Sequence, residues 1–188
     1  TARSQQSLNC SCMGAYVSSI VASQAFLPPV RRQVRFTDPS IVHFVNTSVH
    51  RVPLLFVRHA HGHGNSVRQQ QQQRVRTILF AHGNAEDLAG LEPLANFLST
   101  RLHCNVVCFE FPGYPGTSWL DDTRVDPIEP SESATFEAAE AALQFVLSQS
   151  VASEDLVLFG RSLGTGPSVH LAAHCAQHQI PLHGLILQ

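Results

Sequence analysis

The sequence predicts an α/β fold in which helices cover both faces of a mostly parallel sheet. From residue 77 onward, short apolar runs alternate with segments whose apolar residues recur at helical spacing. This order of strands and helices is typical of parallel strands joined by right-handed crossovers. The chain has 188 residues, 44% hydrophobic and 14% charged, a composition that argues against a disordered chain or a coiled coil.

The chain divides into a leader, residues 1–35, and a folded domain, residues 36–188. The leader is rich in Arg and Ser, and it closes with the segment Phe26–Pro29 and a basic run over residues 31–35. We expect it to be an appendage of the domain.

The first part of the domain contains two predicted strands and a loop. Residues 41–45 and 52–57 are β-branched and apolar, which predicts an antiparallel pair. Residues 59–73 alternate His with Gly and continue through five Gln, a pattern typical of a low-complexity surface loop insertion.

Four buried strands are predicted after this loop. Their residues are apolar nearly throughout, as expected of parallel strands that are covered on both faces. The predicted strands are Thr77–Ala81, Asn105–Phe109, Leu156–Phe159 and Gly184–Leu187.

Two predicted helices connect the first three of these strands. The first runs from about Leu91 to Leu102, with Pro93 near its start. The second covers about residues 136–147 and follows an N-cap at Ser131 or Ser133.

A third predicted helix covers about residues 163–177, with Pro167 in its first turn. Helical spacing predicts an apolar stripe on this helix. The stripe consists of Val169, Ala172, Ala173 and Ala176.

The two parts of the chain differ in charge. Residues 1–76 contain nine Arg and one acidic residue, Asp38, whereas residues 77–188 contain three Arg and thirteen acidic residues. The chain has no Lys. An acidic C-terminal part argues against general nucleic-acid binding.

The sequence Gly160-Arg161-Ser162-Leu163-Gly164 is a G-x-S-x-G motif between a predicted strand and a predicted helix. This is the context of a nucleophile elbow, in which a serine hydroxyl lies on a tight turn above the sheet. Gly160 and Gly164 avoid side-chain clashes in such a turn, and the start of the helix favours negative charge near Ser162. An ordinary turn is the alternative interpretation.

The sequence His82-Gly83-Asn84-Ala85 follows the first predicted parallel strand. A loop at this place can direct a backbone N–H to the point reached by the N–H of Leu163. Two such donors form an oxyanion hole. An ordinary turn between strand and helix is again the alternative.

The sequence of residues 111–116, Phe-Pro-Gly-Tyr-Pro-Gly, follows the next predicted strand. Its Gly and Pro residues favour a rigid turn over a direct contact with substrate.

Together these segments resemble the α/β-hydrolase superfamily, and closely the family of α/β-hydrolase domain-containing proteins 17, which are membrane-associated depalmitoylases. The resemblance covers about residues 41–188 and also Ala25–Pro29 in the leader. It implies an α/β-hydrolase fold, Ser162 as the nucleophile, and the backbone N–H groups of Asn84 and Leu163 as oxyanion-hole donors. It rests on residues 77–88, 110–116, 130–132 and 158–167.

The chain departs from this family in two respects. Glu110 and Phe111 stand where the family usually has Asp and Tyr. In these hydrolases the catalytic Asp and His follow the Ser along the chain. Since the sequence stops soon after the motif, we expect the fold to be incomplete at its C-terminus and the Asp and His of the triad to be absent.

The resemblance implies a serine thioesterase that removes palmitoyl groups from S-acylated membrane proteins without a cofactor. The elbow by itself would serve a carboxylesterase, a lipase or a peptidase equally well. A non-catalytic peripheral membrane or interaction protein is a further alternative, which the expected absence of the triad Asp and His favours.

Cys10 and Cys12 lie in the basic leader, and we predict that both are S-acylated. Two acyl chains, or one chain with a basic patch, hold a protein on an anionic membrane surface. The odd number of cysteines, five, favours a reducing compartment. We therefore expect the domain to lie on the cytoplasmic face of a membrane.

Two groups of three histidines have spacings that can bind a divalent ion, but no suitably placed Glu accompanies either group. We expect no metal site, and we expect the second group to be an exposed stripe of a helix that runs away from Ser162. The groups are His59, His61 and His63, and His170, His174 and His178. The cysteines of the domain, Cys104, Cys108 and Cys175, are expected to be buried.

Overall fold

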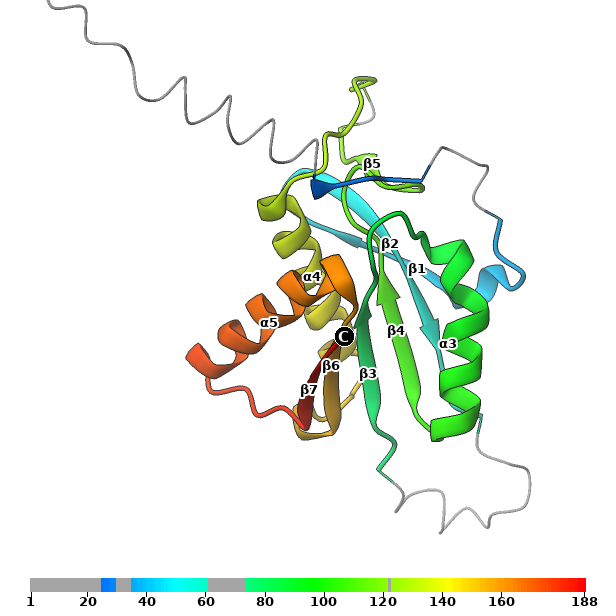
Figure 1. Cartoon of the computed structure of the whole chain (residues 1–188), viewed down its shortest axis with the longest axis vertical. Coiled ribbons are helices and arrows are strands. Elements are labelled where there is room, and N and C mark those ends of the chain that lie inside the picture. Colours follow the sequence, from blue (N-terminus) through cyan, green and yellow to red (C-terminus); the bar gives the residue numbers. More distant parts are fainter. Residues whose placement is uncertain (1–24, 30–34, 61–73, 122) are drawn as a thin grey trace, which may run out of the picture.

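The computed structural model has one sheet at its centre, with the strand order β1-β2-β4-β3-β6-β7 and with β5 paired to β2 (Figure 1). The structure describes residues 25–29, 35–60, 74–121 and 123–188. The strands are β1 (Val42–Asn46), β2 (His50–Val57), β3 (Thr77–Ala81), β4 (Asn105–Phe109), β5 (Ser118–Trp119), β6 (Leu156–Gly160) and β7 (Gly184–Leu187). The helices are α3 (Leu88–Leu102), α4 (Glu132–Ser148) and α5 (Thr165–Gln177), with short 3-10 helices η1 (Pro39–Ile41), η2 (Ser153–Asp155) and η3 (Ser162–Gly164).

The middle of the sheet is parallel and one side is antiparallel. β3 lies between β4 and β6 and is parallel to both, and β7 is parallel to β6. β2 is antiparallel to β4 and to β1, with Val42 opposite Leu55. The predicted mostly parallel sheet and the predicted antiparallel pair are therefore confirmed.

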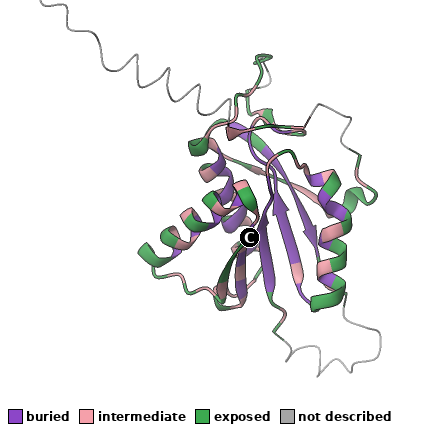
Figure 2. Ribbon diagram, viewed as in Figure 1, coloured by how far each residue is buried: buried purple, intermediate pink, exposed green. Residues whose placement is uncertain are grey.

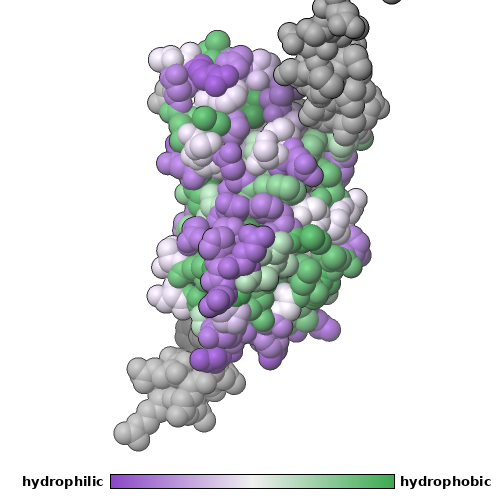
Figure 3. Space-filling model, turned by 90° about the vertical axis from the view of Figure 1, so that its left-hand side faces the viewer, coloured by the Kyte–Doolittle hydropathy of each residue, from purple (hydrophilic) through white to green (hydrophobic). Residues whose placement is uncertain are grey.

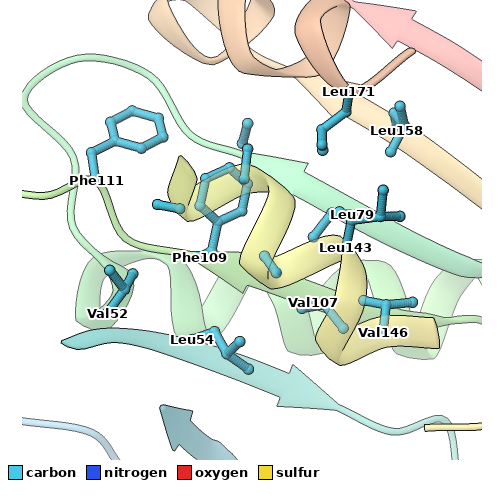
Figure 4. Packing of buried hydrophobic residues seen from close by; sticks show 14 of the residues in the cluster. Val52, Leu54, Leu79, Val107, Phe109, Phe111, Leu143, Val146, Leu158 and Leu171 are labelled. Carbon is cyan, nitrogen blue, oxygen red and sulfur yellow. The ribbon is translucent and has the colours of Figure 1, made fainter. Parts of the chain in front are cut away.

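Helices cover both faces of this sheet, with α3 on one side and α4 and α5 on the other (Figure 1). Successive residues of a strand point to opposite faces. On β3, Ile78 and Phe80 accordingly pack with Leu91 of α3, whereas Leu79 packs with residues of α4 and α5 such as Leu143. The central strands are buried almost throughout (Figure 2), and Figure 4 shows the cluster under α4 and α5.

Helix α3 begins earlier than the sequence predicted. Its N-cap is Asp87, whose side chain accepts a hydrogen bond from Gly90 N–H. Pro93 therefore lies inside the helix and not near its start. Of the two caps left open for α4, the structure has Ser131, which accepts a hydrogen bond from Ala134 N–H.

The predicted apolar stripe on α5 is wrong at three of its four positions, and only Ala172 packs against the core. Val169 is 48% exposed, and Ala173 and Ala176 are also exposed. The elbow turn determines which face of α5 packs against the sheet. That face carries Pro167 and Ser168, and a prediction from apolar spacing alone does not select these two residues. The buried residues of α5 are Pro167, Ser168, Leu171 and Cys175.

One edge of the sheet is exposed and apolar. Leu185, Ile186 and Leu187 of β7 are each more than 40% exposed. Hydrophobic side chains gather on the face of the molecule that carries α5 and β7 (Figure 3). None of the helices in the described part of the chain is long and apolar enough to cross a membrane.

Candidate active site

The turn between β6 and α5 holds Ser162 at the carboxyl end of the sheet. Ser162 has φ +50°, a left-handed conformation that residues other than Gly rarely adopt. Its side chain is exposed, and its backbone carbonyl accepts a hydrogen bond of 2.7 Å from Thr165 Oγ1. Because Ser162 opens the helical segment η3–α5, the helix dipole favours negative charge beside it.

The two glycines of the motif permit close backbone contacts that no side chain would allow. A Cβ on Gly160 would lie 2.5 Å from the carbonyl oxygen of Gly164. A Cβ on Gly164 would lie 2.1 Å from the carbonyl oxygen of Ala81, at the end of β3. The backbone of the elbow is therefore packed directly against the end of β3.

The loop after β3 lies against Ser162. A Cβ on Gly83 would be 3.6 Å from Cβ of Ser162, which is van der Waals contact. The backbone N–H of Asn84 donates to none of the residues that the structure describes. The N–H of Leu163 lies in the first turn of a helical segment, where backbone donors lack intrahelical partners. Two backbone donors thus lie on the segments that flank Ser162.

An ion pair that was not predicted from the sequence joins this loop to the elbow. Glu86 accepts a hydrogen bond of 2.7 Å from Gly83 N–H and pairs with the guanidinium of Arg161. Partial burial opposes ionisation of Glu86, but Arg161 and the Gly83 N–H outweigh it, so the pKa of Glu86 is lowered. The position of Arg161 next to the nucleophile candidate was the only sequence signal for this contact.

Both ring nitrogens of His82 are taken up by partners other than Ser162, and one of these partners is the buried side chain of Glu110. Its Nε2 lies 2.8 Å from Oε1 of Glu110, and neither side chain has any exposed surface. Complete burial opposes protonation of His82, but Glu110 and the Gly83 carbonyl, 2.8 Å from Nδ1, outweigh it and raise the pKa of His82. Glu110 also accepts hydrogen bonds from Leu88 N–H and Phe111 N–H, each at 3.0 Å.

This pair ties the loop after β3 to the end of β4. In the sequence, Glu110 was notable only as a departure from the family. Because β3 and β4 are parallel neighbours, the residues after them meet at the same edge of the sheet, and this rule could have predicted the contact.

The histidines of α5 contact α4 and not Ser162. His170 Nε2 lies 2.7 Å from Glu140 Oε1, and His174 Nδ1 lies 3.6 Å from the same oxygen. The side chains of His170 and His174 are 30% and 22% exposed, so the expected exposed stripe is wrong for both. The reason is that α5 is rotated so that these two histidines face Glu140 of α4. His178 is exposed, as expected.

Within the described ranges, no group of three or more His, Cys, Asp or Glu side chains could hold a metal ion. His61, His63, Cys10 and Cys12 lie outside those ranges. The prediction of buried thiols in the domain is confirmed, and burial raises the pKa of Cys108 to about 12. The buried thiols are Cys104, Cys108 and Cys175.

Residues 111–116 form a tight turn. Gly113 and Gly116 both have φ +90°, and Tyr114 N–H donates to the carbonyl of Phe111 at 2.9 Å. The turn borders a groove of about 780 Å³, which β5, residues 124–126, residues 128–130 and the prolines Pro28 and Pro29 also line. The leader thus contributes a wall to a groove beside the loop that carries Asn84.

Curated proteins include relatives of this chain. Alpha/beta hydrolase domain-containing protein 17B from Homo sapiens is 35% identical over 107 residues, which cover 57% of this chain and 34% of that protein. Alpha/beta hydrolase domain-containing protein 17C from Xenopus tropicalis is 32% identical over 112 residues, 59% of this chain and 33% of that protein. The chain thus spans about a third of the length of these relatives. No protein family model matches it.

A solved structure with the same architecture is that of a cold-adapted esterase from an Arctic intertidal metagenomic library. It superposes with a TM-score of 0.54 at 15% sequence identity and covers 78% of this chain and 58% of that chain. The chain has the α/β-hydrolase fold, and in sequence it resembles the alpha/beta hydrolase domain-containing proteins 17B and 17C.

Proposed function

We propose that this chain carries the nucleophile and the oxyanion hole of a serine hydrolase that cleaves the thioester of S-palmitoylated membrane proteins. The observation that carries the proposal is the strained Ser162 at the start of a helical segment, so close to Gly83 that a Cβ at that glycine would touch Ser162. The resemblance to the alpha/beta hydrolase domain-containing proteins 17 supports hydrolysis, and it motivates a thioester as the substrate.

The reaction proceeds through an acyl-enzyme. Ser162 Oγ attacks the thioester carbonyl and gives its proton to a histidine, while the N–H groups of Asn84 and Leu163 stabilise the oxyanion. The C–S bond then breaks, and the cysteine thiolate takes the proton from the histidine. Water hydrolyses the acyl-serine by the same route in reverse, releasing a fatty acid and restoring Ser162.

The histidine of this reaction belongs to a segment outside the described residues. Among the histidines that the structure describes, none donates to or accepts from Ser162. His82 is fully buried and holds Glu110 and the Gly83 carbonyl, so it has no nitrogen left for catalysis.

A fluorophosphonate probe tests the nucleophile in the full-length protein. We expect the probe to label the wild type and Ser133→Ala, a control at an exposed serine of α4, but not Ser162→Ala. Absence of labelling in the wild type would support the non-catalytic alternative.

Matched peptides that carry palmitoyl-cysteine or palmitoyl-serine test the substrate. A thioesterase cleaves the first faster, whereas equal rates or a preference for the oxygen ester would indicate a carboxylesterase or lipase.

The proposed membrane location depends on the leader. Cys10 and Cys12 in an Arg-rich segment provide two acylation sites and a basic patch, which together suffice for stable attachment to the cytoplasmic face. We expect Cys10→Ser combined with Cys12→Ser to move the protein from the membrane fraction to the soluble fraction. Unchanged fractionation would contradict acylation as the anchor.

A further inference from the structure

The segment Ala25–Pro29, here called the docked segment, lies across the loop that carries Asn84. The backbone N–H of Leu27 donates to Asn84 Oδ1 at 2.7 Å, and Asn84 Nδ2 donates to the carbonyl of Ala25 at 2.7 Å. One side-chain amide therefore pairs with two main-chain groups that lie two residues apart. In Figure 1 the docked segment is the dark blue piece beside β5.

Two aromatic residues strengthen this contact. Phe26 packs against the hydrophobic cluster under α4 and α5, and this contact anchors the docked segment to the domain. The hydroxyl of Tyr114 donates to Asn84 Oδ1 at 2.6 Å, and its side chain is almost fully buried. Burial, opposed in part by the Leu27 N–H, raises the pKa of Tyr114 to about 12, so the donor stays protonated at physiological pH.

Asn84 thus has its side chain held from two sides while its backbone N–H remains free of described partners. Its neighbour Ala85 has φ +58°, a conformation that the surrounding contacts must maintain. An oxyanion hole acts by preorganisation, and small displacements of a donor reduce its effect on the rate. Contacts that orient Asn84 therefore bear directly on the reaction.

We infer that the docked segment positions the oxyanion hole: Leu27, Ala25 and Tyr114 hold the Asn84 side chain and thereby fix the direction of the Asn84 N–H. This inference rests on the proposed function. The main chain of Leu27 makes the hydrogen bond to Asn84, and the residue as a whole is 56% exposed. The leader then orients an oxyanion-hole donor, in addition to its proposed role in attaching the protein to a membrane.

Substitutions at Leu27 separate the main chain from the side chain. Leu27→Pro removes the N–H that donates to Asn84, and the following residue, Pro28, already restricts position 27 to extended conformations. Leu27→Ala keeps the N–H and is the matched control. Loss of one oxyanion-hole donor lowers kcat by about 100-fold to 1,000-fold, so we expect a displaced donor to cost about 10-fold.

The expected result is a kcat for thioester hydrolysis that falls about 10-fold in Leu27→Pro and in Tyr114→Phe, with KM changed less than about twofold. Leu27→Ala should match the wild type. A purely structural role would lower the melting temperature without changing kcat below the transition. Equal kcat values for Leu27→Pro and Leu27→Ala would overturn the inference.

Hydrogen exchange of the Leu27 amide tests the contact without activity. We expect protection in the wild type and faster exchange in Asn84→Ala and Tyr114→Phe. A wild-type protein with a protected Leu27 amide but no hydrolysis would overturn the proposed function and leave the contact established. An unprotected amide would overturn the inference whatever the activity.

Discussion

Two buried histidines in this sheet have opposite surroundings. At the end of β3, His82 has a partner at both ring nitrogens, and one partner is the buried carboxylate of Glu110. At the start of β2, His50 is 6% exposed and packs against the ring of Trp119 of β5, with the ring centres 4.8 Å apart. Its Nδ1 has no hydrogen-bond partner among the described residues. The first histidine is held by several elements of the fold, and the second mainly by a cross-strand neighbour.

The difference extends to the regions around them. The β3 end joins the ends of β4 and β6 through Glu110, Glu86 and Arg161, so a change at one residue affects several elements. The region where β5 pairs with the start of β2, here called the rim, is held by local contacts. One of them is that of Arg124, whose guanidinium lies 3.5 Å from the centre of the Trp119 ring. We therefore expect substitutions at the β3 end to have large effects and those at the rim to have small ones.

The largest effect is expected from Gly164→Ala. Its Cβ would lie 2.1 Å from the Ala81 carbonyl, so the elbow and β3 could not both keep their positions. The expected loss in free energy of unfolding exceeds about 4 kcal/mol, measured by urea denaturation. The control Gly166→Ala adds a Cβ with no atom within 4 Å and should stabilise α5 by up to about 1 kcal/mol. Similar losses in both variants would contradict the steric argument.

Glu110→Ala should have the next largest effect. It leaves the buried His82 without its carboxylate and two backbone N–H groups without acceptors. Removal of one partner of a buried pair costs about 3–5 kcal/mol, measurable by denaturant unfolding. For comparison, Glu137→Ala removes an exposed carboxylate that contacts Ser48 and should cost less than about 1 kcal/mol. Equal losses in the free energy of unfolding for Glu110→Ala and Glu137→Ala would contradict the importance of burial for the pair of His82 and Glu110.

The dependence of stability on pH should differ in sign between the two histidines. The pKa of His82 is raised above 6.5, so its contribution is complete below pH 6.5 and is lost as pH rises through the folded pKa. Burial lowers the pKa of His50, so stability falls as pH drops below 6.5 toward the folded pKa.

Urea unfolding from about pH 5 to about pH 9 would separate these two contributions. We expect His50→Phe to remove part of the decline on the acid side and to leave the decline on the alkaline side unchanged. An unaltered acid side in this variant would contradict the assignment to His50.

The smallest effect is expected from Arg124→Ala at the rim. Trp119 is the only Trp of the chain, and the Arg124 guanidinium covers its ring, so the emission spectrum should change. Arg124 also pairs with Asp126 in an exposed position, where ion pairs contribute little, so the free energy of unfolding should stay within experimental error. A clear loss in the free energy of unfolding would contradict the expected difference between the rim and the β3 end.

Much of the fold follows from local patterns in the sequence. The predicted strands at Thr77–Ala81 and Asn105–Phe109 match β3 and β4, because buried parallel strands are short, apolar and bounded by turns. The early start of α3 at Asp87 was missed because its cap precedes the apolar periodicity. The inward face of α5 was missed because the elbow, and not hydrophobicity alone, determines how that helix is rotated.

By itself, the sequence determined the order of strands and helices and the position of the G-x-S-x-G motif between β6 and α5, because these depend on residues near one another in the chain. Only the tertiary structure decided the contacts between distant segments. His82 with Glu110, Glu86 with Arg161, and Leu27 with Asn84 are separated by 28, 75 and 57 residues, respectively. Hydrogen bonds and ion pairs leave no periodic pattern in a sequence, so these partners could be identified only once the neighbours of β3 in the sheet and the position of the docked segment were known.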